Sequence, residues 1–105
     1  MMSDREVPLP PPSFEFLVFS LRMQAEAQLT EPREGASEGA EGGPDLRLAR
    51  HFIDLLAMLQ DKTKGNLSLE EQRLLDNTVT ELRFRYLHAF EAAQKKAARA
   101  SAPNE

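Results

Sequence analysis

The segment Asp61-Lys-Thr-Lys-Gly65 is the part of this sequence most similar to a reaction centre, because cation-pumping ATPases phosphorylate an aspartate in a related context. An aspartyl-phosphate site needs a loop at the end of a strand, further carboxylates that bind Mg²⁺ and a nucleotide site. Asp61 instead falls in the last turn of a predicted helix. Lys64-Gly65 also lacks the upstream glycine and the following Ser or Thr of a phosphate-binding loop. We therefore interpret the segment as a basic helix end followed by a turn.

The two histidines, His51 and His88, could in principle bind a metal or transfer protons. They fall on different predicted helices, and neither has the Glu-x-x-His spacing of metal sites in helical bundles. Because the chain has no cysteine, a zinc site would need both histidines and two carboxylates from elsewhere. We interpret them as ordinary surface or half-buried side chains, and we expect neither a metal nor another cofactor.

Asp54 lies between Ile53 and Leu55 on a helix that is apolar around much of its circumference, so we expect it to be partly buried. A buried carboxylate needs a partner, and Arg50 one turn back or an arginine of the third helix could serve. A catalytic acid would need a second polar group and a pocket, and the sequence indicates neither. The hypothesis is a structural ion pair, in a protein that is not an enzyme.

Basic residues gather near the C-terminal end, where residues 81–100 hold five Lys or Arg against two Glu. Weak binding of nucleic acid through this segment is the alternative function. The segment 81–100 has few aromatic side chains on which bases could stack, and some of these are needed in the core. Because the whole chain carries a net charge of −4, nucleic acid is not the expected partner.

The second and third helices are predicted from the spacing of apolar residues. In the second, over about 45–63, these residues recur every three or four positions at Ala49, Phe52, Ile53, Leu56 and Leu59. In the third, over about 68–96, they form a seam like that of a coiled coil at Leu75, Val79, Leu82, Tyr86 and Ala89. Glu81 and Arg85 are spaced for an ion pair within the third helix. Together the two helices form a helical hairpin.

The turn of this hairpin is predicted from its own residues. Positive charge near the end of the second helix suits the negative carbonyl end, and a glycine can then adopt the left-handed conformation that stops the helix. A Ser followed three positions later by Glu is a capping box, which starts the next helix. The residues assigned to this structural turn are Lys62, Lys64, Gly65, Asn66, Ser68 and Glu71.

An N-terminal helix is predicted over about 13–29, with Ser13 as its cap. One stripe, expected to face the core, contains Phe14, Leu17, Val18 and Leu21. Phe16, Phe19 and Met23 lie on the opposite side. A helix that is apolar on both faces must be buried on both, and three helices can hardly cover all of this surface. We therefore predict a subunit interface at Phe16, Phe19 and Met23.

The predicted organisation is one helical domain over 13–96 with less ordered segments around it. Residues 1–12 are interpreted as a disordered proline-rich lead-in, 30–43 as a flexible acidic loop rich in Glu and Gly, and 97–105 as a disordered tail. A domain this small buries little surface, and without cysteine it cannot gain stability from disulfides. Self-association is the expected source of further burial.

Several segments of the chain resemble a bacterial family catalogued as domain of unknown function 1844. They are the run Ile53-Asp-Leu-Leu-Ala-Met-Leu, the turn Lys62-Thr-Lys-Gly-Asn-Leu67, Glu70-Glu and Leu82-Arg-Phe-Arg, together with residues 14–25. The resemblance covers roughly residues 13–90, and the chain departs from it in the Glu/Gly insertion after Leu29. It implies a short, soluble, helical bacterial protein and transfers no activity, ligand or residue role.

The sequence therefore predicts an all-α, three-helix protein that acts as a non-catalytic, homo-oligomeric interaction or scaffold module. Its partner is a second copy or another protein that the sequence does not identify. No export signal is recognisable, and no apolar run is long enough to span a bilayer. We expect a cytoplasmic protein that does not associate with a membrane.

Overall fold

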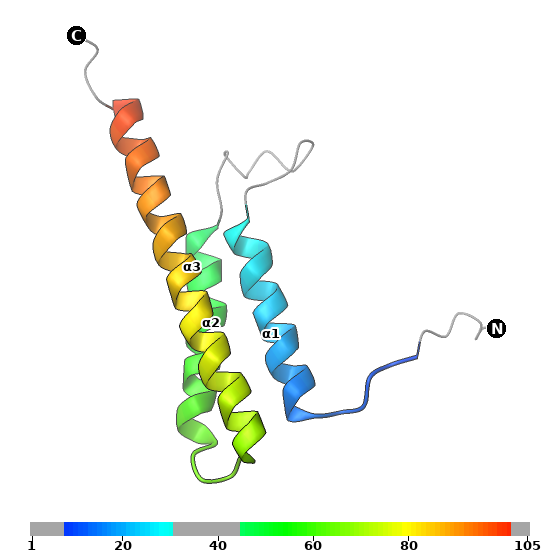
Figure 1. The fold of residues 1–105 in the computed structure, drawn as a ribbon. Coiled ribbons are helices and arrows are strands. Elements are labelled where there is room, and N and C mark those ends of the chain that lie inside the picture. Colours follow the sequence, from blue (N-terminus) through cyan, green and yellow to red (C-terminus); the bar gives the residue numbers. More distant parts are fainter. Residues whose placement is uncertain (1–7, 31–44, 102–105) are drawn as a thin grey trace, which may run out of the picture.

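The computed structural model describes residues 8–30 and 45–101, and these residues form three α-helices and no strand. The helices are α1 (Phe14–Leu29), α2 (Leu46–Lys62) and α3 (Leu69–Ser101), as Figure 1 shows. The predicted all-α, three-helix fold is confirmed. None of the helices in the described part of the chain is long and apolar enough to cross a membrane.

Polar side chains start α1 and α2, and Ser13 does so at the predicted position. The Ser13 hydroxyl accepts a hydrogen bond of 3.0 Å from the Phe16 backbone N–H. The Asp45 carboxylate likewise accepts one of 3.1 Å from the Leu48 backbone N–H. Each bond satisfies a donor that the first turn of a helix otherwise leaves without a partner. The backbone N–H of Asp45 donates to the Gln28 carbonyl oxygen, which ties the start of α2 to the end of α1.

The predicted turn between α2 and α3 is confirmed in its hydrogen bonds. Lys62 is the last residue of α2, and Gly65 has a φ of 82°, in the left-handed region that favours glycine. The Ser68 backbone N–H donates to Glu71 Oε1 at 2.8 Å, and the Glu71 backbone N–H donates to Ser68 Oγ at 3.1 Å. This reciprocal pair is the capping box. Asn66 contributes its backbone N–H, which donates to the Thr63 carbonyl oxygen.

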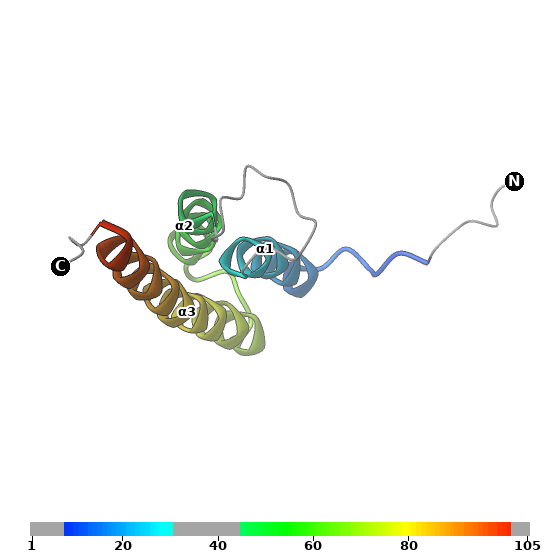
Figure 2. The same cartoon turned by 90° about the horizontal axis from the view of Figure 1, so that it is seen from above.

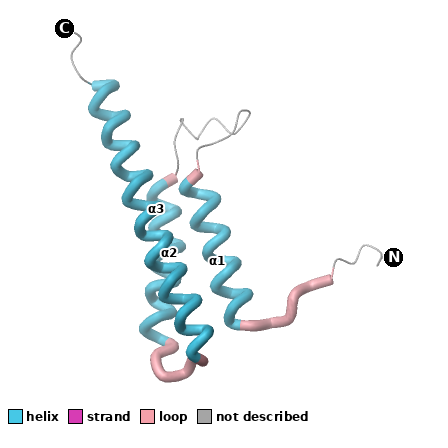
Figure 3. The backbone as a smooth tube through the Cα atoms, in the orientation of Figure 1, coloured by secondary structure: helices cyan, strands magenta, loops and turns pink. Residues whose placement is uncertain are grey.

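The three helices pack side by side, with α1 and α3 running in the same direction and α2 in the opposite one (Figures 1 and 3). Each helix contacts the other two, and the view from above shows them around a common centre (Figure 2). The core lies between them and consists of small and branched apolar side chains: Val18, Ala25, Ile53, Leu56, Leu75, Val79 and Leu82.

Helix α3 is much longer than its neighbours. Its 33 residues span about 50 Å, whereas α1 and α2 each span about 25 Å, so its C-terminal part projects beyond them (Figures 1 and 2). Of the predicted seam, Leu75, Val79 and Leu82 are buried, while Tyr86 and Ala89 are half-buried.

The ends of the ordered segments differ in part from the predicted boundaries. Helix α3 continues to Ser101, so the first five residues of the predicted disordered tail, 97–101, are helical. Alanine has the highest helix propensity, so this Ala-rich stretch favours continuation of the helix. Residues 8–12 of the predicted lead-in are non-helical. The rest of the lead-in, the acidic loop after residue 30 and the last part of the tail lie outside the described residues.

Candidate interaction surface

Helix α1 has a buried face and an exposed apolar face. Val18 and Ala25 are fully buried against α2 and α3. Phe16, Phe19 and Met23, at spacings of three and four, are between 41% and 53% exposed. The three predicted interface residues therefore share a side of α1 that no other described helix covers. We call Phe16, Phe19 and Met23 the outer face of α1.

The prediction that Leu17 belongs to the core stripe was wrong. Leu17 is 42% exposed, whereas Phe14 and Leu21 pack partly buried against the core and Ala25 occupies a fully buried position. Leu17 precedes Val18 by one residue, which turns its side chain about 100° around the helix from the buried one. The other two helices cover a narrower strip of α1 than the spacing of large apolar residues suggested. A small residue, Ala25, lets the helices approach there.

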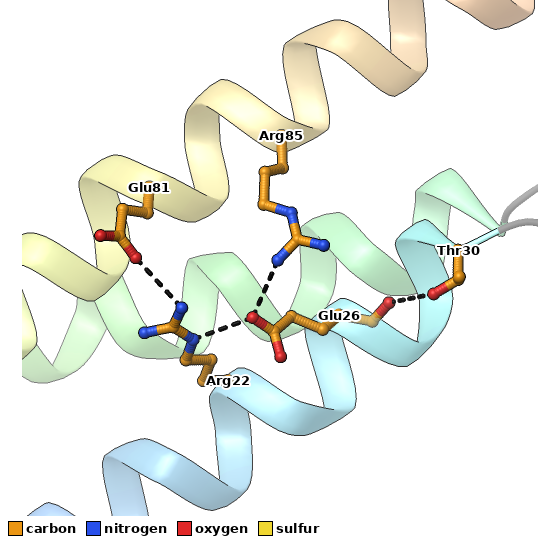
Figure 4. A network of polar contacts seen from close by, with 5 residues as sticks. All are labelled: Arg22, Glu26, Thr30, Glu81 and Arg85. Carbon is orange, nitrogen blue, oxygen red and sulfur yellow. Dashed lines mark hydrogen bonds and ion pairs between the residues drawn. The ribbon is translucent and has the colours of Figure 1, made fainter.

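Four charged side chains join α1 to α3 on the side of the molecule away from α2 (Figure 4). Arg22 Nε lies 2.9 Å from Glu26 Oε2, and Arg22 Nη2 lies 3.1 Å from Glu81 Oε1. Arg85 Nη1 lies 2.9 Å from the same Glu26 oxygen. Glu26 thus bridges an arginine from each helix, which holds α1 in one register and one orientation against α3.

The sequence interpretation placed Glu81 and Arg85 in an ion pair within α3, but each of them pairs with α1 instead. The signal that could have revealed this is the charge order, because α1 reads Arg22 then Glu26 while α3 reads Glu81 then Arg85. Two parallel helices with opposite orders at the same spacing can pair across the interface as well as along each helix. Which pairing forms depends on the distance between the helices.

The electrostatics of this network concentrate on Arg22. The hydrogen bond to Glu26 raises the pKa of Arg22, desolvation works against this, and the charges of Glu26 and Glu81 raise it further. Arg22 is therefore charged throughout the range in which proteins fold. Thr30 donates its hydroxyl to the Glu26 carbonyl oxygen at 2.8 Å, which closes the last turn of α1 beside the network (Figure 4).

We expect Glu26→Gln to lower the free energy of unfolding by about 1 kcal/mol, because the charge that bridges two arginines is lost while the shape is kept. The matched control is Asp54→Asn, which removes a carboxylate from an exposed pair and is expected to cost about 0.3 kcal/mol or less. Urea unfolding in low and high salt measures both, and the Glu26 effect should shrink as salt screens the network. Equal losses for the two variants would contradict the bridging role.

The prediction for Asp54 is half right. Its carboxylate lies 3.6 Å from Arg50 Nε, so the pairing with the preceding turn is confirmed. The expected burial is wrong, since the Asp54 side chain is 63% exposed. The buried face of α2 is formed by Ala49, Ile53 and Leu56, and the next residue after Ile53 already turns toward solvent.

The two histidines lie on different helices, as predicted, and both are exposed. The ring of His51, on α2, meets the neighbouring Phe52 ring edge-on with centroids 5.5 Å apart. His88, on α3, borders an open depression with Leu29 and Arg85. No group of three or more His, Asp or Glu side chains that could hold a metal ion occurs within residues 8–30 and 45–101.

The fold and surface define a small three-helix protein that presents an apolar helix face to solvent. Among the described residues, polar side chains form helix caps, the turn, the α1–α3 network and a hydrogen bond from Gln60 of α2 to Asp76 of α3. The family model described as domain of unknown function 1844 matches residues 11–88, and the chain belongs to that family. The match spans all of α1 and α2 and ends at His88, before the projecting part of α3. No curated protein and no solved structure matches the chain.

Proposed function

We propose that this chain is a non-catalytic interaction module that associates with copies of itself through the outer face of α1. The observation that carries the proposal is the exposure of Phe16, Phe19 and Met23 together on one side of one helix. Burial of apolar surface is worth about 25 cal/mol per Å², and complete burial of a fully exposed phenylalanine contributes about 1.5–3 kcal/mol. Because Phe16 and Phe19 are already about half covered, each is expected to add about half of that. A surface of this kind is typical of contact sites between proteins.

The size of the core supports the proposal. The buried apolar side chains of the described residues are few, and two of them are alanines. A domain with such a core gains substantially from a second apolar contact, and this chain has no cysteine for a disulfide. The proposed location is the cytoplasm, because a reducing compartment suits a chain without cysteine.

The decisive measurement is the mass of the intact chain in solution by size-exclusion chromatography with light scattering. We expect at least twice 11.8 kDa for the natural sequence. Phe16→Glu combined with Met23→Glu should lower the mass at least twofold while circular dichroism still reports a folded helical protein, because both side chains point away from the core.

Met58→Glu is the matched control, since Met58 is an exposed apolar residue of α2 with a similar exposure of 43%. It should leave the mass unchanged. A natural chain that is folded and monomeric would overturn the proposal, and so would a Phe16→Glu, Met23→Glu variant that keeps the full mass.

A further inference from the structure

We infer that α3 pairs antiparallel with α3 of a second copy of this chain, with Phe84 and Leu87 at the centre of the contact. The inference rests on the proposed self-association and extends it, because this surface belongs to a different helix from the outer face of α1. The inference specifies what binds to α3, which is α3 of a second copy, and also the direction and register in which the two helices pair.

Helix α3 has an apolar centre on the side turned away from the core. Phe84 follows the fully buried Leu82 by two residues, which directs it to about the opposite side of the helix, and it is 62% exposed. Leu87 is one turn further along and is also exposed. On the same side of α3, Thr80 lies four residues before Phe84 and Glu91 lies four residues after Leu87. Phe84 and Leu87 therefore form a short apolar seam between polar residues.

The charges of α3 change sign near its middle. Its first half, 69–82, carries four acidic residues and one arginine, a net charge of −3. Its second half, 83–101, carries five basic residues and one glutamate, a net charge of +4. Two parallel copies would place like charges together, whereas two antiparallel copies place each acidic half against a basic half. Charge complementarity therefore selects a second copy in the antiparallel direction.

The register follows from the position of the apolar seam. Residue 85 is the midpoint of α3, and a twofold axis just beyond it places Phe84 against Leu87 of the partner subunit. The same axis brings Glu70 near Arg99 of the partner subunit. The projecting end of each α3, which α1 and α2 leave uncovered, then lies along the exposed first half of the other (Figure 1).

Two separate twofold contacts on one protomer predict an assembly larger than a dimer. The smallest closed assembly with two kinds of twofold contact is a tetramer of D2 symmetry, so we expect the natural chain at about four times 11.8 kDa. The variant Phe84→Glu with Leu87→Glu should have half that mass, as should the α1 variant Phe16→Glu with Met23→Glu. The chain that carries all four substitutions should be a monomer.

Introduced cysteines test the direction of pairing, because the natural chain has none. Arg73 and Ala98 are exposed positions equally far from the proposed axis. Under oxidation, the full chain with both Arg73→Cys and Ala98→Cys should form covalent dimers in high yield, whereas either single variant should form few. Efficient crosslinking of the single variants would indicate parallel pairing and would overturn the inference. An absence of crosslinks in the double variant would overturn it as well.

The outcomes separate this inference from the proposed function. If Phe84→Glu with Leu87→Glu leaves the mass unchanged while the α1 variant halves it, the α3 contact is wrong and the proposed function stands. If the α1 variant keeps the mass of the natural chain and the cysteines crosslink, the proposed contact through the outer face of α1 is wrong and the α3 contact stands. If oligonucleotide binding at low salt weakens on Lys95→Ala with Lys96→Ala and no α3 crosslink forms, the basic end serves nucleic acid and the inference is overturned.

Discussion

Leu56→Ala or Leu82→Ala is expected to lower the free energy of unfolding by about 2–5 kcal/mol, the usual range for truncating a buried leucine. Both side chains are fully buried, one from α2 and one from α3, and both belong to the single core between the helices. The core is small, so the lost contacts cannot be replaced by nearby side chains without moving a helix. For a domain whose whole stability is about 5–15 kcal/mol, either change removes much of it.

Urea unfolding followed by circular dichroism measures this loss, at one fixed protein concentration because association adds to the apparent stability. Leu17→Ala is the matched control, since it makes the same change on α1 at a residue that is 42% exposed. It should cost about 1 kcal/mol or less, because little buried volume is lost. A loss at Leu17 as large as that at Leu56 would show that Leu17 belongs to the core after all.

Gly65→Ala should have the second largest effect, a loss of about 1–2 kcal/mol in the free energy of unfolding. The backbone of Gly65 has a φ of 82°, where a side chain crowds the following carbonyl oxygen. An added Cβ meets no heavy atom within 4 Å, so the cost comes from backbone strain and not from a clash with the rest of the protein. Thermal unfolding of the two proteins at equal concentration measures the difference.

Gly65→Asn separates the two explanations, because asparagine tolerates the left-handed conformation better than other residues with a side chain. We expect it to cost clearly less than Gly65→Ala although its side chain is larger. If the asparagine variant were the less stable of the two, side-chain crowding would decide the effect, and the conformational argument for the turn would be wrong.

The helices and the turn could be predicted from the sequence because short-range forces determine them. The capping box of Ser68 and Glu71 needs only a separation of three residues, and both of its hydrogen bonds are present. Gly65 and Ser13 act through their own backbone and the adjacent turn in the same way. The division of α1 into a buried and an exposed face followed from helical periodicity, and it holds for Val18 and for Phe16.

Two of the predictions that failed depended on how far around a helix its neighbours cover it. Periodicity assigned Leu17 to the core and Asp54 to a half-buried position, and both side chains are exposed. Neither residue carries a local signal of this outcome. What decides the exposure of each side chain is how much of its own helix the other two helices cover. That width depends on the distances between the three helices.

Local chemistry in the chain therefore specified where each helix begins, where α2 ends and which residues form the turn, since caps, glycine conformation and periodicity act over a few positions. Packing alone decided that Arg22 meets Glu81 and that Glu26 meets Arg85, residues 59 positions apart. Such pairs depend on the direction and separation of α1 and α3, because an ion pair forms only when its side chains come within about 4 Å.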